Sequence, residues 1–157
     1  MLGVAGVRAA APGRVPPDLV VLAGPPAPGP AGAVDHLVVT VRNGRGVVGP
    51  LVLPGRGPCL RCAAMAGHGP HPGPRTAAPH VVTATGALAV GQVLAAVDGP
   101  VRGGDPPASW AAQLEIDPDT ARITARRVHR HPDCPCRTAS VPTAPCGTTA
   151  QGWTITV

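Results

Sequence analysis

The chain of 157 residues has no lysine, no phenylalanine and no tyrosine, and it has only two tryptophans. A hydrophobic core must therefore come from valine, leucine and alanine, and each fully buried valine or leucine contributes roughly 1.5–3 kcal/mol. The 21 glycines and 22 prolines interrupt helices and strands and favour turns. This length and composition predict one small domain in which a metal cross-link would matter for stability.

Acidic residues are also scarce, since eight of them stand against thirteen arginines and leave a formal net charge of +5. The densest basic segment, residues 126–131, reads RRVHRH. On a strand these side chains alternate between two faces, and no aromatic residues lie among them to stack on bases. We therefore predict a solvated basic face and no nucleic-acid partner.

The first residues, MLGVAGVRAAAPGR, lack the basic segment followed by a sustained apolar stretch that is typical of a signal peptide. We therefore expect a cytoplasmic protein. In a reducing cytoplasm, closely spaced cysteines indicate metal ligands sooner than disulfides.

Short apolar segments bounded by turn residues predict a sheet. DLVVLA at 18–23 is a continuous apolar run, which is typical of a strand buried on both faces of a parallel sheet. HLVVTV at 36–41 and a return strand within 47–55 flank Asn43 and Gly44, which supply the positive φ angles of a tight hairpin.

One long segment, HVVTATGALAVGQVLAAVD at 80–98, carries no charge between its first and last residues. Gly99 and Pro100 follow it and supply a helix stop signal. A membrane span is the alternative, but the uncharged stretch is at the lower limit of a span and includes polar residues and glycines. We therefore predict a helix buried against the sheet and no membrane partner, with Gly86 and Gly91 allowing close approach of the backbone.

A second hairpin is predicted after this helix, because strand-like segments at 110–117 and 121–129 flank the turn residues PDT. This hairpin leads the chain directly to Cys134. The final residues, 137–157, show no clear periodicity, and we expect them to be disordered.

Four cysteines form two tight pairs that are far apart in the sequence, C-x-x-C at Cys59 and Cys62 and C-x-C at Cys134 and Cys136. Zinc favours four tetrahedral ligands, and the two pairs offer two thiolates from each of two loops. A closed site of four thiolates has no open position for a substrate, so such a zinc would be structural. A disulfide or four inert thiols are the alternatives, but unrelated free cysteines have no reason to occur as two tight pairs.

Three other residues are weaker candidates. His68 and His71 lie in a segment rich in proline and glycine and can reach a metal, but a lone loop histidine more often faces solvent. Cys146 is unpaired, and we interpret it as incidental. A catalytic role is disfavoured for all of the cysteines, because no histidine or acidic partner can be assigned to any cysteine from the sequence.

Read in order, these segments resemble the C-terminal half of the ThiF/MoeB/HesA family, the bacterial relatives of ubiquitin-activating enzymes. The resemblance covers about residues 17–136 and rests on DLVVL, GPLVLPGRGPCLRC, TGALAVGQVLAAVDG, WAAQLEIDPDTARITARRV and HPDCPC. The sequence of the segment VVGPLVLPGRGPCLRC is similar to that of the ThiF-like proteins of thiazole- and oxazole-modified peptide biosynthesis.

This resemblance implies an α/β fold, namely the C-terminal half of a partial Rossmann-like activating-enzyme fold with β-hairpins and a buried helix. It also implies adenylation of a carboxyl terminus with ATP and magnesium. Its structural zinc is carried over onto Cys59, Cys62, Cys134 and Cys136.

The catalytic features of the family do not carry over. Nucleotide binding in this fold needs a glycine-rich turn between a strand and its helix, and only GVAGVRAA near the start is similar, with no predicted strand before it. The family has a magnesium-binding aspartate just after the strand matching DLVVL, where this chain has Ala23, Gly24 and Pro25. No catalytic residue is identified, the question of enzyme activity stays open, and ATP and magnesium are not expected here.

Two hypotheses follow. The first is a fragment or degenerate member of the ThiF-type ATP-dependent adenylyltransferases, acting in modified-peptide or sulfur-carrier biosynthesis. The second is a non-catalytic scaffold for a cyclodehydratase that binds a peptide or partner. Expected partners are a peptide or carrier-protein C-terminus or a cyclodehydratase subunit. We also expect a homo- or hetero-oligomer, because a half sheet exposes strand edges. The predicted layout is a flexible segment at 1–16, the half domain with its zinc at 17–136, and a disordered tail at 137–157.

Overall fold

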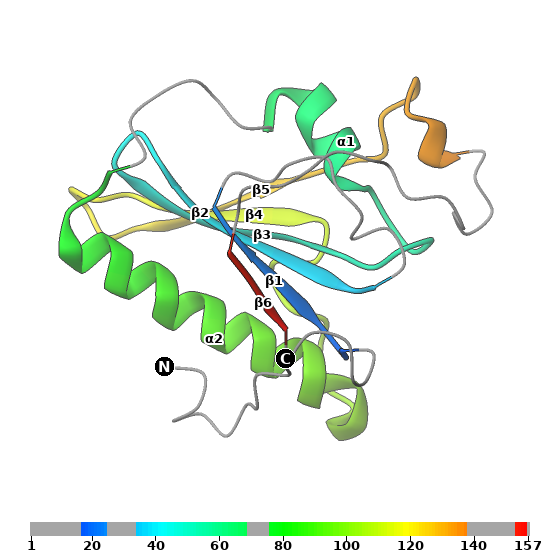
Figure 1. Ribbon diagram of the computed structural model, residues 1–157, viewed down its shortest axis with the longest axis horizontal. Helices are drawn as coiled ribbons and strands as arrows, with labels where there is room; N and C mark the ends of the chain where they lie inside the picture. Colours follow the sequence, from blue (N-terminus) through cyan, green and yellow to red (C-terminus); the bar gives the residue numbers. More distant parts are fainter. Residues whose placement is uncertain (1–16, 25–33, 69–75, 138–152, 157) are drawn as a thin grey trace.

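The computed structural model describes residues 17–24, 34–68, 76–137 and 153–156 of the chain. They form a six-stranded sheet with the strand order β5-β4-β3-β2-β1-β6 (Figure 1). The strands are β1 (Val20–Ala23), β2 (His36–Arg42), β3 (Arg45–Val52), β4 (Ala112–Ile116), β5 (Ile123–Arg127) and β6 (Trp153–Thr156). The helical elements are α1 (Leu60–Ala63), η3 (Ala64–His68), α2 (Pro79–Arg102) and η4 (Pro135–Arg137).

The sheet is mixed, because β1 and β2 are parallel while the other neighbouring strands are antiparallel. The apolar run at 18–23 predicts a strand buried on both faces. It forms a strand in a parallel pair, but only Leu19 and Val21 on one face are buried, whereas Val20 and Leu22 on the other face are partly buried. The predicted α/β class, with two hairpins and one long helix, is therefore confirmed at this coarser level.

Both predicted hairpins form. Asn43 and Gly44 make the turn between β2 and β3 with φ angles of 50° and 75°, the left-handed conformations that such a turn requires. The β4–β5 turn begins at Asp117, whose Oδ1 accepts hydrogen bonds of 3.0 Å from the backbone N–H groups of Asp119 and Thr120. The side chain of Asp117 thus satisfies backbone groups that the turn leaves without a strand partner.

Helix α2 runs alongside the sheet and contacts β2, β3 and β4 (Figure 1). Its buried positions recur every four residues, at Val81, Thr85, Ala89 and Val93. Much of the rest of the helix is open, with Val82 50% and Val97 40% exposed. The prediction of a buried helix is therefore right for one face only. By length and composition, Pro79–Gly99 is also apolar enough to cross a membrane, although 22% of that window is buried.

The end of α2 also differs from the prediction, because the helix continues through Gly99 and Pro100 to Arg102. Gly103 ends it with a φ of 65°, and the N–H of Gly104 donates to the carbonyl of Gly99 at 3.0 Å. The φ angle of proline suits a helix and the residue removes only one hydrogen-bond donor, so the left-handed glycine sets the boundary.

The close approach between helix and sheet occurs at Gly46 of β3, and the prediction that Gly91 serves this purpose is wrong. A Cβ atom on Gly46 would lie 1.8 Å from Oγ1 of Thr85, which donates a 2.6 Å hydrogen bond to the carbonyl of Val81. A Cβ atom on Gly91 would meet no described atom within 4 Å. Gly46 is therefore the glycine that lets α2 pack against β3.

The two faces of β3 are both covered. Val48 packs in the core cluster with Leu37, Leu114 and Val93, on the side of α2. Val47 points to the opposite face, where it is fully buried, and α1 contacts β3. Figure 1 shows α1 and α2 on opposite sides of the sheet, so the first cysteine pair lies away from the long helix.

The C-terminal residues differ from the expectation of a disordered tail. Residues 153–156 form β6, which pairs antiparallel with β1, with Val20 opposite Thr156 and Ala23 opposite Trp153. The alternating residues WTIT suit an extended strand. Residues 138–152, as well as the predicted flexible segment 1–16, lie outside the described residues.

Candidate metal centre

The first cysteine pair is positioned by the start of α1. Cys59 is the N-cap residue, with an extended backbone (φ −91°, ψ 174°), and Cys62 follows in the first turn. Residues three apart lie on the same side of a helical turn, so the two thiols face the same direction. Cys62 is fully buried, whereas Cys59 is partly exposed.

The second pair is positioned by tight turns after β5. The N–H of Cys134 donates to the carbonyl of His131, and the N–H of Arg137 donates to the carbonyl of Cys134, both at 3.1 Å. These bonds fold the chain back at Pro135, where η4 begins. The short C-x-C spacing can therefore present two thiols to one point.

The structure brings all four predicted cysteines together. Sγ of Cys59 lies 3.8 Å from Sγ of Cys62 and 3.6 Å from Sγ of Cys134. Sγ of Cys62 lies 3.4 Å from Sγ of Cys136, and all four sulfur atoms are within 4.8 Å of one another. Four thiolates at zinc's usual bond length of about 2.3 Å in a tetrahedron have sulfur–sulfur distances of about 3.8 Å. The cluster therefore fits a four-thiolate metal site, and zinc suits it in size and ligand type.

Burial and hydrogen bonding shift the pKa values of the thiols in different directions. Burial raises the pKa of Cys59 and, together with bonds to neighbouring thiols, that of Cys136. Burial also acts to raise the pKa of Cys62, but hydrogen bonds outweigh it, chiefly from the backbone N–H of His131 at 3.3 Å, so the pKa of Cys62 falls to about 7. Cys62 therefore ionises more readily than Cys59 and Cys136 do.

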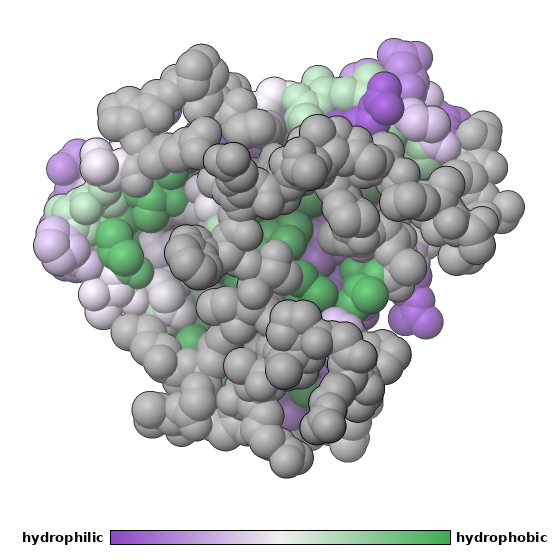
Figure 2. Space-filling model, viewed as in Figure 1, coloured by the Kyte–Doolittle hydropathy of each residue, from purple (hydrophilic) through white to green (hydrophobic). Residues whose placement is uncertain are grey.

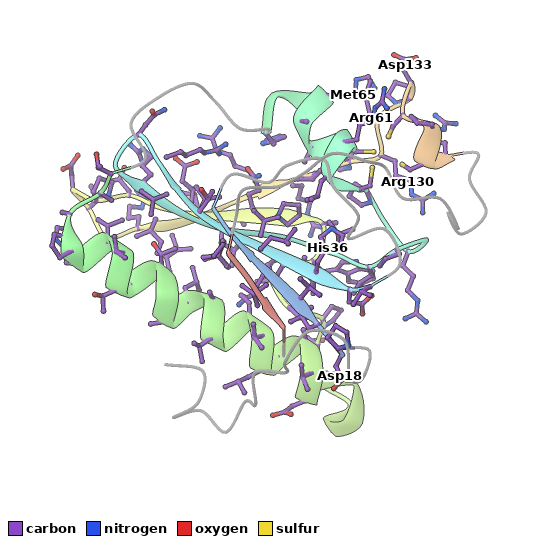
Figure 3. All side chains as sticks on the ribbon, in the orientation of Figure 1. Asp18, His36, Arg61, Met65, Arg130 and Asp133 are labelled. Atoms are coloured by element: carbon purple, nitrogen blue, oxygen red, sulfur yellow. The ribbon has the colours of Figure 1, made fainter. Side chains whose placement is uncertain are left out.

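Charged side chains lie at the same end of the molecule as the cluster. Arg61 lies between the cysteines of the first pair, and Arg130 donates through Nη2 to the carbonyl of Gly55 at 2.9 Å. Figure 3 shows Arg61, Arg130 and Asp133 at the sulfur-bearing end of the molecule, and Figure 2 shows hydrophilic residues on its surface there.

The weaker candidates do not join the cluster in the part of the chain that the structure describes. The carbonyl of His68 accepts a 3.0 Å hydrogen bond from Nε2 of Gln113, so His68 anchors η3 to β4 through its backbone. His71 and Cys146 lie outside the described residues.

A charged network that the sequence did not predict extends across β2, β3, β4 and β5. Glu115 is buried and has Arg42, Arg45 and Arg126 within 3.4–3.6 Å. Arg45 also pairs with Asp117. Backbone hydrogen bonds from Thr120, followed by the bond from Arg45, lower the pKa of Asp117 to about 2. Only the strand register brings these residues together, so spacing in the sequence gives no signal of them.

An open hollow of about 320 Å³ lies where the carboxyl ends of β1 and β2 meet α2. It is lined by Gly24, Val39, Thr40, Val41, Val82, Thr85 and Gly86. Ligands of open α/β sheets commonly bind at the carboxyl ends of parallel strands. Among the described lining residues no side chain is charged, so the hollow offers no carboxylate for a magnesium ion.

Comparison with known proteins identifies similarity of fold only. No family model and no curated protein matches the chain. The structure of the microcin C7 biosynthetic enzyme MccB in complex with N-formylated MccA is similar, with a TM-score of 0.56 and 20% identity over 85% of this chain and 42% of that chain. E. coli MccB with ATP gives a TM-score of 0.51 and 23% identity, covering 75% and 33% of the two chains.

A heterocyclase in complex with substrate and cofactor is also similar, with a TM-score of 0.53 and 15% identity over 68% of this chain and 17% of that chain. The chain thus spans less than half the length of each of these proteins. At these identities the similarity shows a shared partial fold.

Proposed function

We propose that this chain is a ThiF-type protein of peptide-modification biosynthesis, clamped by a structural zinc. The observation that carries the proposal is the cluster of Cys59, Cys62, Cys134 and Cys136 on a mixed sheet whose fold is similar to that of MccB. MccB is a biosynthetic enzyme for microcin C7 and was solved with a peptide, MccA, and the heterocyclase was solved with its substrate. A peptide role for this chain is consistent with both, and free thiols suit a reducing cytoplasm.

The proposed zinc would link the segment after β3 to the segment after β5. A site closed by four thiolates has no open coordination position, so the metal would stabilise the fold without touching a substrate. The N–H of His131, which points to Sγ of Cys62, would stabilise the thiolate once the metal is bound.

A specific observation favours a binding role over adenylation by the described residues. Adenylation joins a carboxylate oxygen to the α-phosphorus of ATP and releases pyrophosphate, so it needs groups that hold a triphosphate and magnesium. The hollow at the ends of β1 and β2 is lined by apolar and small residues, and Ala23 and Gly24 occupy the place of the family's aspartate. We therefore propose a scaffold that binds a peptide or a partner enzyme, with adenylation as the second candidate.

Calorimetric titration of the zinc-loaded full chain with magnesium-ATP separates these candidates. The scaffold predicts no heat of nucleotide binding and saturable binding to members of an array of short synthetic peptides with free carboxyl ends. Nucleotide binding, with amidation of the peptide ends abolishing pyrophosphate release, would instead establish the adenylyltransferase. Failure to bind either ATP or any peptide of the array would rule out adenylation and the peptide-binding form of the scaffold.

A further inference from the structure

Strand β5 is open on both faces and along one edge. It is the last strand at its end of the sheet, and of the described elements β4 is the only one with which it has extensive contacts. Each of its residues, 123–127, is exposed, and Ile123 is 55% exposed although it is apolar. An open edge of this kind can pair with a further strand.

The hydrogen bonds at the two ends of the β4–β5 pair show which backbone groups point outward. The N–H of Asp117 donates to the carbonyl of Arg122 at 2.9 Å, and the N–H of Val128 donates to the carbonyl of Ala111 at 2.8 Å. In an antiparallel pair, residues bonded across the ladder alternate with residues whose N–H and C=O groups point away. The even-numbered residues of β5 therefore bond to β4. The residues whose backbone groups face the open edge are Ile123, Ala125 and Arg127.

This edge is basic. Residues 122–130 contain four arginines and no acidic residue. Arg126 pairs with Glu115, yet its side chain is 59% exposed, and Arg127 is exposed on the opposite face. Pairing of β5 with a second copy of itself would gather two sets of these arginines along one seam, and their repulsion opposes it. Charge therefore favours a strand that carries carboxylates.

The direction of the arginines favours a polypeptide over a nucleic acid. Arg126 and Arg127 point to opposite faces of the sheet, and consecutive side chains of an added strand do the same. A phosphate backbone that follows one face would leave one of the two arginines unused. In addition, β5 has no aromatic residue on which a base could stack.

We propose that the open edge of β5 binds an acidic, extended peptide segment, which adds to the sheet as a further strand. Its backbone would bond to the outward groups of Ile123, Ala125 and Arg127. In the antiparallel direction that β3, β4 and β5 follow, two consecutive acidic residues would lie opposite Arg127 and Arg126, and a β-branched residue would lie opposite Ile123. The inference rests on the proposed peptide-binding role and names the place, the mode and the chemistry of binding.

The probe is a fluorescent synthetic peptide, Glu-Glu-Val-Thr-Val, whose binding to the zinc-loaded full chain is read by anisotropy. Ala125→Pro removes the central outward N–H and no bond to β4, and edge strands accept proline where the N–H faces solvent. Its matched control is Ala125→Val, which keeps the N–H. Arg127→Glu tests the charge, and Arg56→Glu, at an exposed position in the loop after β3, changes the net charge equally.

Ala125→Pro should bind the probe at least about tenfold more weakly than Ala125→Val does, because strand addition depends on main-chain hydrogen bonds. Arg127→Glu should bind it at least about tenfold more weakly than Arg56→Glu does, and should prefer a probe with lysines in place of the glutamates. No binding by the parent chain, or equal affinity within either pair of variants, overturns the proposal. A single-stranded oligonucleotide that displaces the probe and binds Ala125→Pro as well as Ala125→Val assigns the edge to nucleic acid and also overturns it.

Hydrogen exchange of the unaltered chain, read amide by amide, locates the probe even if Ala125→Pro does not fold. In the free chain the amides of Ile123, Ala125 and Arg127 should exchange faster than those of Thr124 and Arg126, and excess probe should slow the first set. Outward amides that are already protected, as in a dimer through this edge, or that the probe leaves unchanged are the contrary result. Array peptides that bind without protecting these amides would refute this location and leave the proposed scaffold in place, whereas an array without any binding peptide would refute the peptide role itself.

Discussion

Cys62 is the residue at which the proposed metal centre is best prepared for binding. Its pKa of about 7, set by burial and the opposing hydrogen bond from the N–H of His131, leaves much of it as thiolate at neutral pH. The pKa values of Cys59 and Cys136 are raised, so these thiols release their protons when the metal binds. Metal affinity should therefore fall with pH wherever these thiols are protonated, and more steeply below about pH 7, where Cys62 is protonated as well.

Replacing Cys62 with serine should remove the metal. A serine hydroxyl does not ionise in this range and is a poor zinc ligand, so three thiolates remain around an open position. Elemental analysis after dialysis should show zinc falling from about one per chain to below about a tenth. Cys146→Ser is the matched control and should keep its zinc. Full zinc occupancy in Cys62→Ser would rule out the four-cysteine site.

Asp117 is the residue whose charge most clearly supports a turn. Its folded pKa is about 2, below the usual value near 4, because the Thr120 backbone and Arg45 favour the carboxylate. A depressed carboxyl pKa contributes stability that is present above the unfolded pKa and is lost as pH falls through the folded pKa.

Asp117→Asn should therefore unfold at lower urea concentration than the parent chain at pH 7. The gap between the two midpoints should hold down to about pH 4 and shrink between pH 4 and pH 2. Thiol protonation affects both proteins equally, so the difference isolates Asp117. A gap that is constant down to pH 2 would show that the charge of Asp117 contributes no stability.

At the scale of elements, the packing of α2 on β3 depends on the absence of one side chain. Gly46→Ala would place a Cβ atom 1.8 Å from Oγ1 of Thr85. The helix or the strand must shift, and overpacking of this kind costs about 1–3 kcal/mol. Urea unfolding should show this loss for Gly46→Ala.

Two further variants test whether the contact with Thr85 causes the loss of stability in Gly46→Ala. Thr85→Ala in the same chain removes the clashing hydroxyl, so the double variant should be more stable than the sum of the single changes predicts. Gly91→Ala, in the open part of α2, should stabilise the chain by up to about 1 kcal/mol because alanine favours helix. Additive losses at positions 46 and 85 would place the strain elsewhere.

The elements that the sequence predicts well are those set by local signals. Asn43–Gly44 specifies its turn through positive φ angles, and the apolar run at 18–23 specifies a strand that pairs in parallel with its neighbour. The contact of Gly46 with Thr85 and the charges around Glu115 join segments that are distant in sequence, so no local pattern reveals them. The cysteine pairs are the exception among long-range features, because their residue type and tight spacing restrict what they can do.

At the scale of the whole molecule, the cysteine cluster is a cross-link between distant segments. Cys59 and Cys134 are 75 positions apart and lie 3.6 Å from each other, and the chain between them includes α2 and the β4–β5 hairpin. With no phenylalanine or tyrosine in the core, the fold has few large side chains to hold these segments together. A bound metal would therefore contribute a large share of the net stability.

Stability should consequently follow the concentration of free zinc. Because the metal binds the assembled site and hardly binds scattered cysteines, each tenfold rise in free zinc above the dissociation constant should add about 1.4 kcal/mol to the free energy of unfolding. Urea unfolding in zinc buffers measures this slope, and Cys62→Ser should give none. A parent chain that unfolds at the same urea concentration with chelator as with zinc would show that the sheet and α2 hold the two cysteine pairs together without the metal.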